Sequence, residues 1–212
     1  MTGPAAPSRD CPLCPRLVAF REAQRAVYSD WHNAPVSSFG DPDPWLAIVG
    51  LAPGLKGANR TGRPFTGDAS GPLLYGTLLK FGLVDGAFAG HADDGLRLAG
   101  VRILNAVRCV PPLNKPTPAE IHACRPFLER ELAALPRLRV VVALGQIAHQ
   151  SAIKALGGKL PKCRFAHGAE HRLPNGMVLI DSYHCSRYNQ NTGRLTPDMF
   201  EAVFRRAQEL AP

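Results

Sequence analysis

The chain has 212 residues, which suits one domain with a sizeable hydrophobic core. Its 45% hydrophobic and 20% charged residues are typical of a globular protein, and apolar runs such as Val140–Leu144 fall far short of the roughly 20 residues of a membrane helix. Because Arg9, Asp10 and Cys11 interrupt the start of the chain, we expect no signal peptide and a cytoplasmic location without membrane contact.

The charge is basic, since 25 lysines and arginines against 17 acidic residues give +8. Such a surface favours polyanions such as nucleic acid or anionic lipid, whereas a scattered, solubilising surface is an equally good interpretation of charge alone. Six cysteines without an export signal argue against a disulfide framework and for metal binding, reactivity or burial.

Strands and helices alternate after residues 1–10, which we expect to form a loose tail. A helix is predicted from Ser70, its N-cap, to a stop at Gly82, and in a second helix Thr117 and Glu120 form a capping box. The predicted strands cover residues 46–49, 100–109, 139–145 and 177–184, and the predicted helices cover residues 70–81, 117–135, 146–156 and 196–210.

This alternation predicts an α/β protein whose residues 1–212 form a single domain. We expect a three-layer α/β/α sandwich around a central, mainly parallel, four-stranded sheet. In such folds ligands bind in the loops at the carboxyl ends of the strands. Three loops qualify, after Val49, after Val107 and after Tyr183, and the functional side chains are expected there.

Four of the cysteines are spaced as two pairs. Cys11 and Cys14 form a C-x-x-C pair, and Cys109 and Cys124 follow with fourteen residues between them. Two such pairs hold either zinc or an iron–sulfur cluster, and the spacing does not separate the metals because both accept four thiolates. In the other interpretation Cys109 and Cys124 are core residues, since Cys124 lies on the apolar face of its predicted helix.

The loop after Val49, GLAPGLKGANRTGRPFTGDASG, is rich in glycine, so its backbone can approach a ligand closely. It matches neither a P-loop nor G-x-G-x-x-G, but the backbone N–H groups of the Gly50 to Gly54 stretch, which includes Ala52, suit an anion or a base edge. Phe65 is either a stacking platform for a base or part of a small apolar cluster. Asp68 either orients water or interacts with the dipole of the following helix.

The other two loops add amides and a histidine. An asparagine amide offers a donor and an acceptor, which matches a pyrimidine edge, and Asn105 is positioned for this at the end of its strand. Asn114, in PPLNKPTP, is equally suited to a turn between prolines. In SYHCSRYNQNTGRL, His184 beside Cys185 is either structural or catalytic, and its expected place at the same edge as Asn105 favours catalysis.

Taken together, these residues resemble the uracil-DNA glycosylase superfamily, and within it the type-5, iron–sulfur branch of bacteria and archaea. The resemblance covers nearly the whole chain. It is carried by CPLCPRLVAFRE, GLAPGLKGANRTGRPFTGDASG, NAVRCVPPLNKPTPAEIHACRPFLERE, VVALGQIA, FAHGAE and SYHCSRYNQNTGRLT.

The resemblance implies roles for individual residues. His184 is then the catalytic histidine, Phe65 stacks on the extruded uracil and Asn105 reads the pyrimidine edge. Asp68 and Asn114 are implied to handle water, because this chain has Leu51 and Ala52 where most branches carry an acid or an amide. The other implied sets are base-binding Gly50, Ala52 and Gly54, a DNA-inserting loop with Ser186, Arg187, Tyr188 and Asn189, and [4Fe–4S] ligands Cys11, Cys14, Cys109 and Cys124.

A DNA-repair enzyme is therefore expected. It would be a monomeric, monofunctional glycosylase that extrudes uracil, and by hypothesis hypoxanthine or other deaminated bases, and hydrolyses the N-glycosidic bond to leave an abasic site for base excision repair. Where the superfamily has a proline after the histidine this chain has Cys185, so we expect a less rigid loop. Two alternatives remain, a non-catalytic iron–sulfur or zinc-stabilised DNA-binding protein and a nucleotide hydrolase.

Overall fold

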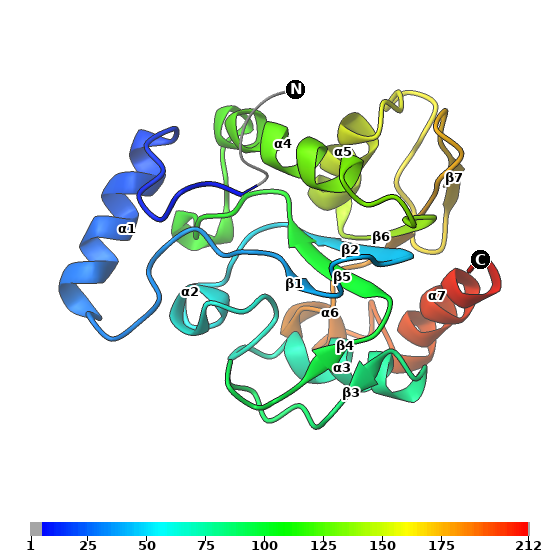
Figure 1. The fold of residues 1–212 in the computed structure, drawn as a ribbon, viewed down its shortest axis with the longest axis horizontal. Coiled ribbons are helices and arrows are strands. Elements are labelled where there is room, and N and C mark those ends of the chain that lie inside the picture. The colour runs from blue at the N-terminus through cyan, green and yellow to red at the C-terminus, as the bar shows by residue number, and fades with distance from the viewer. Residues whose placement is uncertain (1–5, 212) are drawn as a thin grey trace.

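A six-stranded sheet forms the middle layer of the protein in the computed structural model, which describes residues 6–211 (Figure 1). The four central strands are parallel, and a short antiparallel strand closes each edge. In spatial order the strands are β1 (Phe39–Gly40), β5 (Val101–Asn105), β2 (Leu46–Gly50), β6 (Val140–Leu144), β8 (Val178–Ser182) and β7 (Glu170–Arg172). The four predicted strands are thus confirmed as the parallel centre, and the edge strands β1 and β7 were not predicted.

Helices cover both faces of this sheet, which confirms the three-layer α/β/α sandwich (Figure 1). On one face α3 (Gly71–Lys80) and α7 (Pro197–Glu209) pack on side chains such as Ile48 and Val142. On the other face α4 (Pro118–Ala133) and α5 (Gln146–Ala155) pack on the alternate side chains, such as Val49 and Val141. The remaining elements are α1 (Pro15–Val27), α2 (Ala58–Thr61), α6 (Arg187–Asn191), the 3-10 turn Pro112–Asn114 and a small hairpin of β3 (Val84–Asp85) and β4 (Arg97–Leu98).

The predicted helix ends are partly confirmed. Thr117 and Glu120 form the expected capping box, with Glu120 Oε2 accepting from the Thr117 N–H at 2.7 Å. Gly82 ends α3 in the left-handed conformation, with φ of +67°. Ser70 occupies the predicted N-cap position of α3, but its side chain makes no cap hydrogen bond. Asp68 Oδ1 instead accepts from the Ser70 N–H at 2.9 Å.

Arg9 and Asp10, at the end of the stretch expected to form a loose tail over residues 1–10, contact α1. Arg25 on α1 forms an ion pair with Asp10 at 2.7 Å and donates to the Arg9 carbonyl at 3.4 Å. Ser8 accepts from the Cys11 N–H at 3.1 Å. Residues 1–5 lie outside the described residues. None of the described helices is long and apolar enough to span a membrane.

We predict that replacing Thr117 by alanine lowers the free energy of unfolding by about 1 kcal/mol, because the Glu120 N–H loses its acceptor at the start of α4. Denaturant unfolding measures the change. Thr117→Ser keeps the hydroxyl and is the matched control, so equal stability of the two variants would contradict the capping role.

Candidate active site

A cleft of about 740 Å³ lies at the carboxyl ends of β2, β5 and β8, and the three predicted loops meet there. Nine of the residues predicted for the site line this cleft. They are Ala52, Gly54, Phe65, Asp68, Asn105, Asn114, His184, Ser186 and Arg187. Backbone bonds beyond the strand ends hold the first two loops together, since Ala106 and Val107 donate to the carbonyls of Gly50 and Leu51 at 2.9 Å.

Phe65 and His184 lie side by side in the cleft. Their ring centroids are 6.0 Å apart, with 28° between the ring planes. Phe65 has a φ of +51°, a left-handed conformation that a non-glycine residue keeps only where its surroundings hold it. Here the Tyr75 hydroxyl donates to the Pro64 carbonyl at 2.7 Å, and the neighbouring Arg63 forms a two-pronged ion pair with Asp94. The backbone on the N-terminal side of Phe65 is therefore held in place by side chains outside the loop.

Gly50 does not line the cleft but makes room for two residues that do. A Cβ atom at this position would lie 2.6 Å from Asn105 Oδ1 and 2.8 Å from Phe65 Cζ, distances at which atoms clash. These distances give Gly50 a packing role, and its predicted contact with the substrate stays a prediction. Its missing side chain allows the Asn105 amide and the Phe65 ring to approach each other on the cleft wall.

Asp68 is held against the glycine-rich loop. Its Oδ2 atom would lie 2.4 Å from a Cβ at Gly57 and 3.2 Å from one at Gly54, so side chains there would push the carboxylate away.

Burial lowers the pKa of His184 below its ordinary value of 6.5, while the Asp68 charge acts in the opposite direction and raises it. Burial has the larger effect, so the His184 imidazole is neutral at physiological pH.

Asn114 reaches the cleft from the turn that its prolines predicted. It follows Leu113, and both residues have left-handed backbones, with φ of +56° and +54°. Asparagine adopts this conformation more readily than most residues. The turn and the cleft position are therefore compatible, and both interpretations of Asn114 describe the same geometry.

The segment after His184 is more ordered than the sequence suggested. Residues Arg187–Asn191 form the short helix α6, capped by the Ser186 hydroxyl. Asn189 is not among the residues that line the cleft, and its side-chain amide donates to the His184 carbonyl at 2.8 Å. Tyr188 is 71% exposed and lies beyond the cleft lining. Cys185, which stands where the superfamily has a proline, is fully buried in the core.

The four paired cysteines line one cavity between α1, α4 and the segment after β5. The Arg108 N–H donates to Cys124 Sγ at 3.3 Å, and Arg21 donates to Cys109 Sγ at 3.7 Å. Burial raises the pKa of Cys109 to about 12 and that of Cys14 to about 11, and in both cases a neighbouring Cys124 charge adds to the rise. Four converging thiols with N–H donors at two sulfurs suit a thiolate-bound metal centre.

The model of the "Uracil DNA glycosylase superfamily" matches residues 37–208. The chain belongs to this superfamily. It is 50% identical over 206 residues to a type-5 uracil-DNA glycosylase of Thermus thermophilus, covering 95% of this chain and 94% of that protein. Type-5 enzymes of Mycobacterium tuberculosis and Pyrobaculum aerophilum are 46% and 42% identical, over 95% and 93% of this chain and 78% and 88% of their own lengths.

Some residues of the glycosylase cleft were not predicted. Lys56, Gly57 and Ser70 also line it. Lys56 is a positively charged residue within the glycine-rich loop, and this charge could have marked it in the sequence as a residue of the site.

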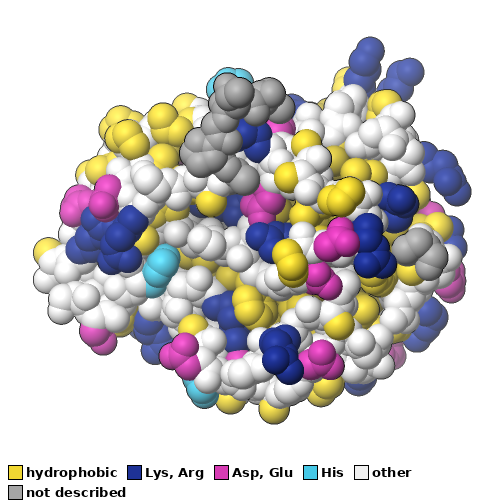
Figure 2. Space-filling model, in the orientation of Figure 1, with side chains coloured by type: hydrophobic (Ala, Val, Ile, Leu, Met, Phe, Trp, Pro, Cys, Tyr) yellow, Lys and Arg dark blue, Asp and Glu magenta, His cyan; other side chains and the backbone are white. Residues whose placement is uncertain are grey.

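Figure 2 shows that lysines and arginines on the face displayed are mixed with acidic side chains rather than gathered in one patch. On this face the basic charge is therefore scattered.

We predict that the His184 imidazole titrates below pH 6.5 and that Asp68→Asn lowers its pKa further, because the raising effect of the carboxylate is lost. A pH titration of the histidine NMR signals, assigned with His184→Gln, measures both. Asp198→Asn on the exposed side of α7 is the control and leaves the pKa unchanged. A His184 pKa above 6.5, or one that Asp68→Asn leaves unchanged, would contradict these electrostatic effects.

Proposed function

We propose that this protein is a type-5 uracil-DNA glycosylase that removes uracil from DNA in base excision repair. The observation that supports this most is the meeting of Phe65, Asn105 and His184 in one cleft. An aromatic ring, an amide and a neutral imidazole are the groups needed to stack on, recognise and activate an extruded pyrimidine. A base inside a duplex is out of reach, so extrusion precedes the chemistry and costs a few kcal/mol.

In the proposed reaction, breaking the N-glycosidic bond leaves negative charge on the base and positive charge on the sugar. A neutral His184 donates an N–H to the carbonyl oxygen on which that negative charge develops, as an oxyanion hole does. Asn105 holds the pyrimidine edge through its donor and acceptor. Phe65, fixed by its neighbours, keeps the base stacked while the bond stretches.

Water then attacks the sugar carbon, and we assign its placement to Asp68 and Asn114. Both line the cleft, from the loop after β2 and from the turn before α4. The position of the Asp68 carboxylate is fixed by the hydrogen bond that it accepts from the Ser70 N–H. Gly54 and Gly57, which have no side chains, leave room for it. Its negative charge also stabilises the developing positive charge on the sugar.

DNA is proposed to lie across the cleft mouth. Lys56 and Arg187 line the cleft and are suited to phosphates, which supply most of the affinity. Tyr188, exposed on the capped helix α6, is placed to enter the space that the extruded base leaves. All of these cleft residues come from one chain, which supports action as a monomer. We also propose that the protein acts in the cytoplasm.

We further propose that Cys11, Cys14, Cys109 and Cys124 hold a [4Fe–4S] cluster with a structural role. The support is their convergence in one cavity, the hydrogen bonds to two of the sulfurs and the resemblance to the type-5 branch. The cluster would fix α1 and α4 against the segment after β5. Purified protein with iron and sulfide supports this assignment, and colourless protein with stoichiometric zinc excludes it.

The proposed activity is tested by base release from oligonucleotides carrying uracil, hypoxanthine or a thymine mismatch, as single and double strands, with alkali revealing abasic sites. We expect uracil to be released fastest. Intact uracil-containing DNA after incubation with iron-loaded protein would instead support the non-catalytic DNA-binding alternative. Hydrolysis of free nucleotides without any action on DNA would support the nucleotide hydrolase.

We predict that His184→Ala reduces the single-turnover rate of uracil release by about 100- to 1000-fold, the usual effect of removing an oxyanion donor. Circular dichroism and DNA affinity should stay close to those of the parent protein, because the ring lies at the cleft and outside the core clusters. His122→Ala, an exposed position on α4, is the control. A folded His184→Ala enzyme with a normal rate would remove His184 from the mechanism.

We predict that Cys124→Ser lowers the iron content and the melting temperature by at least ~5 °C, which is about 2 kcal/mol for a chain of this size. Cys163→Ser, on the loop after α5, is the matched control and keeps both values. Unchanged iron and melting in Cys124→Ser would contradict the ligand assignment.

A further inference from the structure

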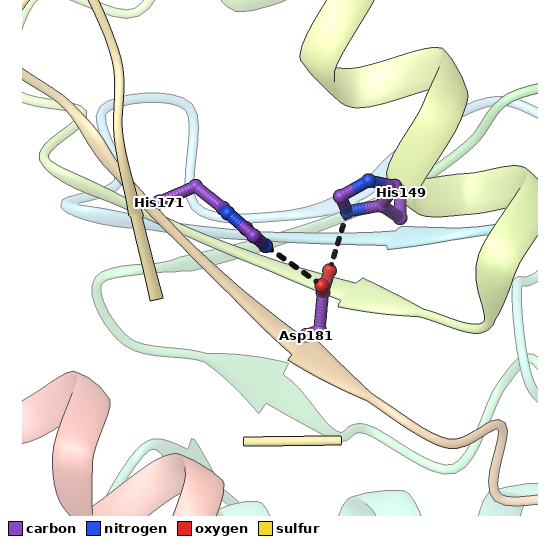
Figure 3. A group of neighbouring side chains, drawn as sticks. All are labelled: His149, His171 and Asp181. Carbon is purple, nitrogen blue, oxygen red and sulfur yellow. Dashed lines mark hydrogen bonds and ion pairs between the residues drawn. The ribbon is translucent and has the colours of Figure 1, made fainter. Parts of the chain in front are cut away.

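Three side chains, two of them buried, converge on the face of the sheet that α5 covers, outside the cleft lining (Figure 3). His149 comes from α5, His171 from the edge strand β7 and Asp181 from β8. Both rings are directed at the same carboxylate. The distances are 2.7 Å from His149 Nδ1 to Asp181 Oδ1 and 2.9 Å from His171 Nε2 to Asp181 Oδ2.

The hydrogen bonds of His149 are unusual because both ring nitrogens face acceptors. Nδ1 faces the carboxylate, and Nε2 lies 3.0 Å from the Cys163 carbonyl. A neutral imidazole carries one N–H and can donate to one of them. His149 is 1% exposed, so with Asp181 ionised the second contact calls for either a buried imidazolium or a metal cation at one nitrogen.

The arrangement also has the features of a zinc site. The ligand atoms of the three residues all lie within 4.8 Å of one another, so small side-chain movements bring them onto one ion. Two imidazoles and one carboxylate are a frequent zinc ligand set. Histidine ligands of zinc usually donate their other N–H to a carbonyl or carboxylate, and the Cys163 carbonyl occupies that place behind His149.

We propose that His149, His171 and Asp181 form a zinc-binding site distinct from the cysteine cavity. Zinc binds His149 through Nδ1, His171 through Nε2 and Asp181 through its carboxylate, and water completes the tetrahedron. The proton between His149 Nδ1 and the carboxylate is released to solvent, and the His171 proton moves from Nε2, where it faces Asp181, to Nδ1. His149 retains the Nε2–H that the Cys163 carbonyl accepts.

Such an ion would bind α5 to β7 and β8, two strands that the sheet already pairs through their backbones. It would fasten α5 and the edge strand β7 to β8, the strand that ends two residues before His184. The loop between α5 and β7 is also attached here, because Ala166 N–H donates to Asp181 Oδ2 at 3.4 Å. The site is therefore structural, and it supports the strand that delivers the catalytic histidine.

The test uses the full chain with its iron content measured throughout, so that zinc at the cysteines is detected as lost iron. Protein is equilibrated with zinc chloride, freed of excess zinc by gel filtration and analysed for both metals. We expect one equivalent of bound zinc, unchanged iron and a higher melting temperature. Absence of retained zinc, or zinc gained with an equivalent loss of iron, would overturn the proposal.

Variants then locate the ion. His171→Gln, on the edge strand and partly exposed, and Asp181→Asn are expected to lose the zinc and its effect on melting while retaining iron. His122→Gln on the surface of α4 is the matched control and keeps the zinc. If Asp181→Asn does not fold, His171→Gln decides alone, and zinc retained by folded His171→Gln places the ion elsewhere and refutes this site.

Discussion

Residue 50 has no room for a side chain, because a Cβ atom there would lie 2.6 Å from Asn105 Oδ1 and 2.8 Å from Phe65 Cζ. This constraint sits where β2, in the middle of the parallel sheet, ends at its carboxyl edge. The Phe65 ring and the Asn105 amide therefore approach across a bare backbone, and β8 delivers His184 to the same cleft. The resulting space offers one apolar face and two polar ones, which is the chemistry that a flat pyrimidine requires.

The cysteine cavity and the cleft are connected through the start of α4. Asn114 lies three residues before the Thr117 cap, and Cys124 lies two turns into the helix. Arg16 on α1 ties these parts together by bonding both Glu120 carboxylate oxygens and the Lys115 carbonyl. A cluster that anchors α1 to α4 would therefore also fix the turn that presents Asn114. A metal centre at the cysteines would in this way control the position of Asn114 without contacting the cleft.

Much of this arrangement follows from the sequence. Short, mostly apolar runs mark the four parallel strands. Because the carboxyl ends of these strands share one edge, three distant loops are expected to form one site. The edge strands β1 and β7 were not predicted because two or three residues carry no periodic signal. Helix α1 was missed because it buries only Leu17 and Arg21. The His149, His171 and Asp181 group has no spacing motif, since its members meet only through the sheet order.

Phe65, Asn105 and His184 are proposed to surround one extruded base. The most direct measurement is a crystal structure of the protein with free uracil, the released product. We predict uracil stacked on the Phe65 ring, with its edge on the Asn105 amide and a carbonyl oxygen within hydrogen-bond distance of a His184 ring nitrogen. Uracil bound with its edge away from Asn105, or bound outside this cleft, would contradict the account.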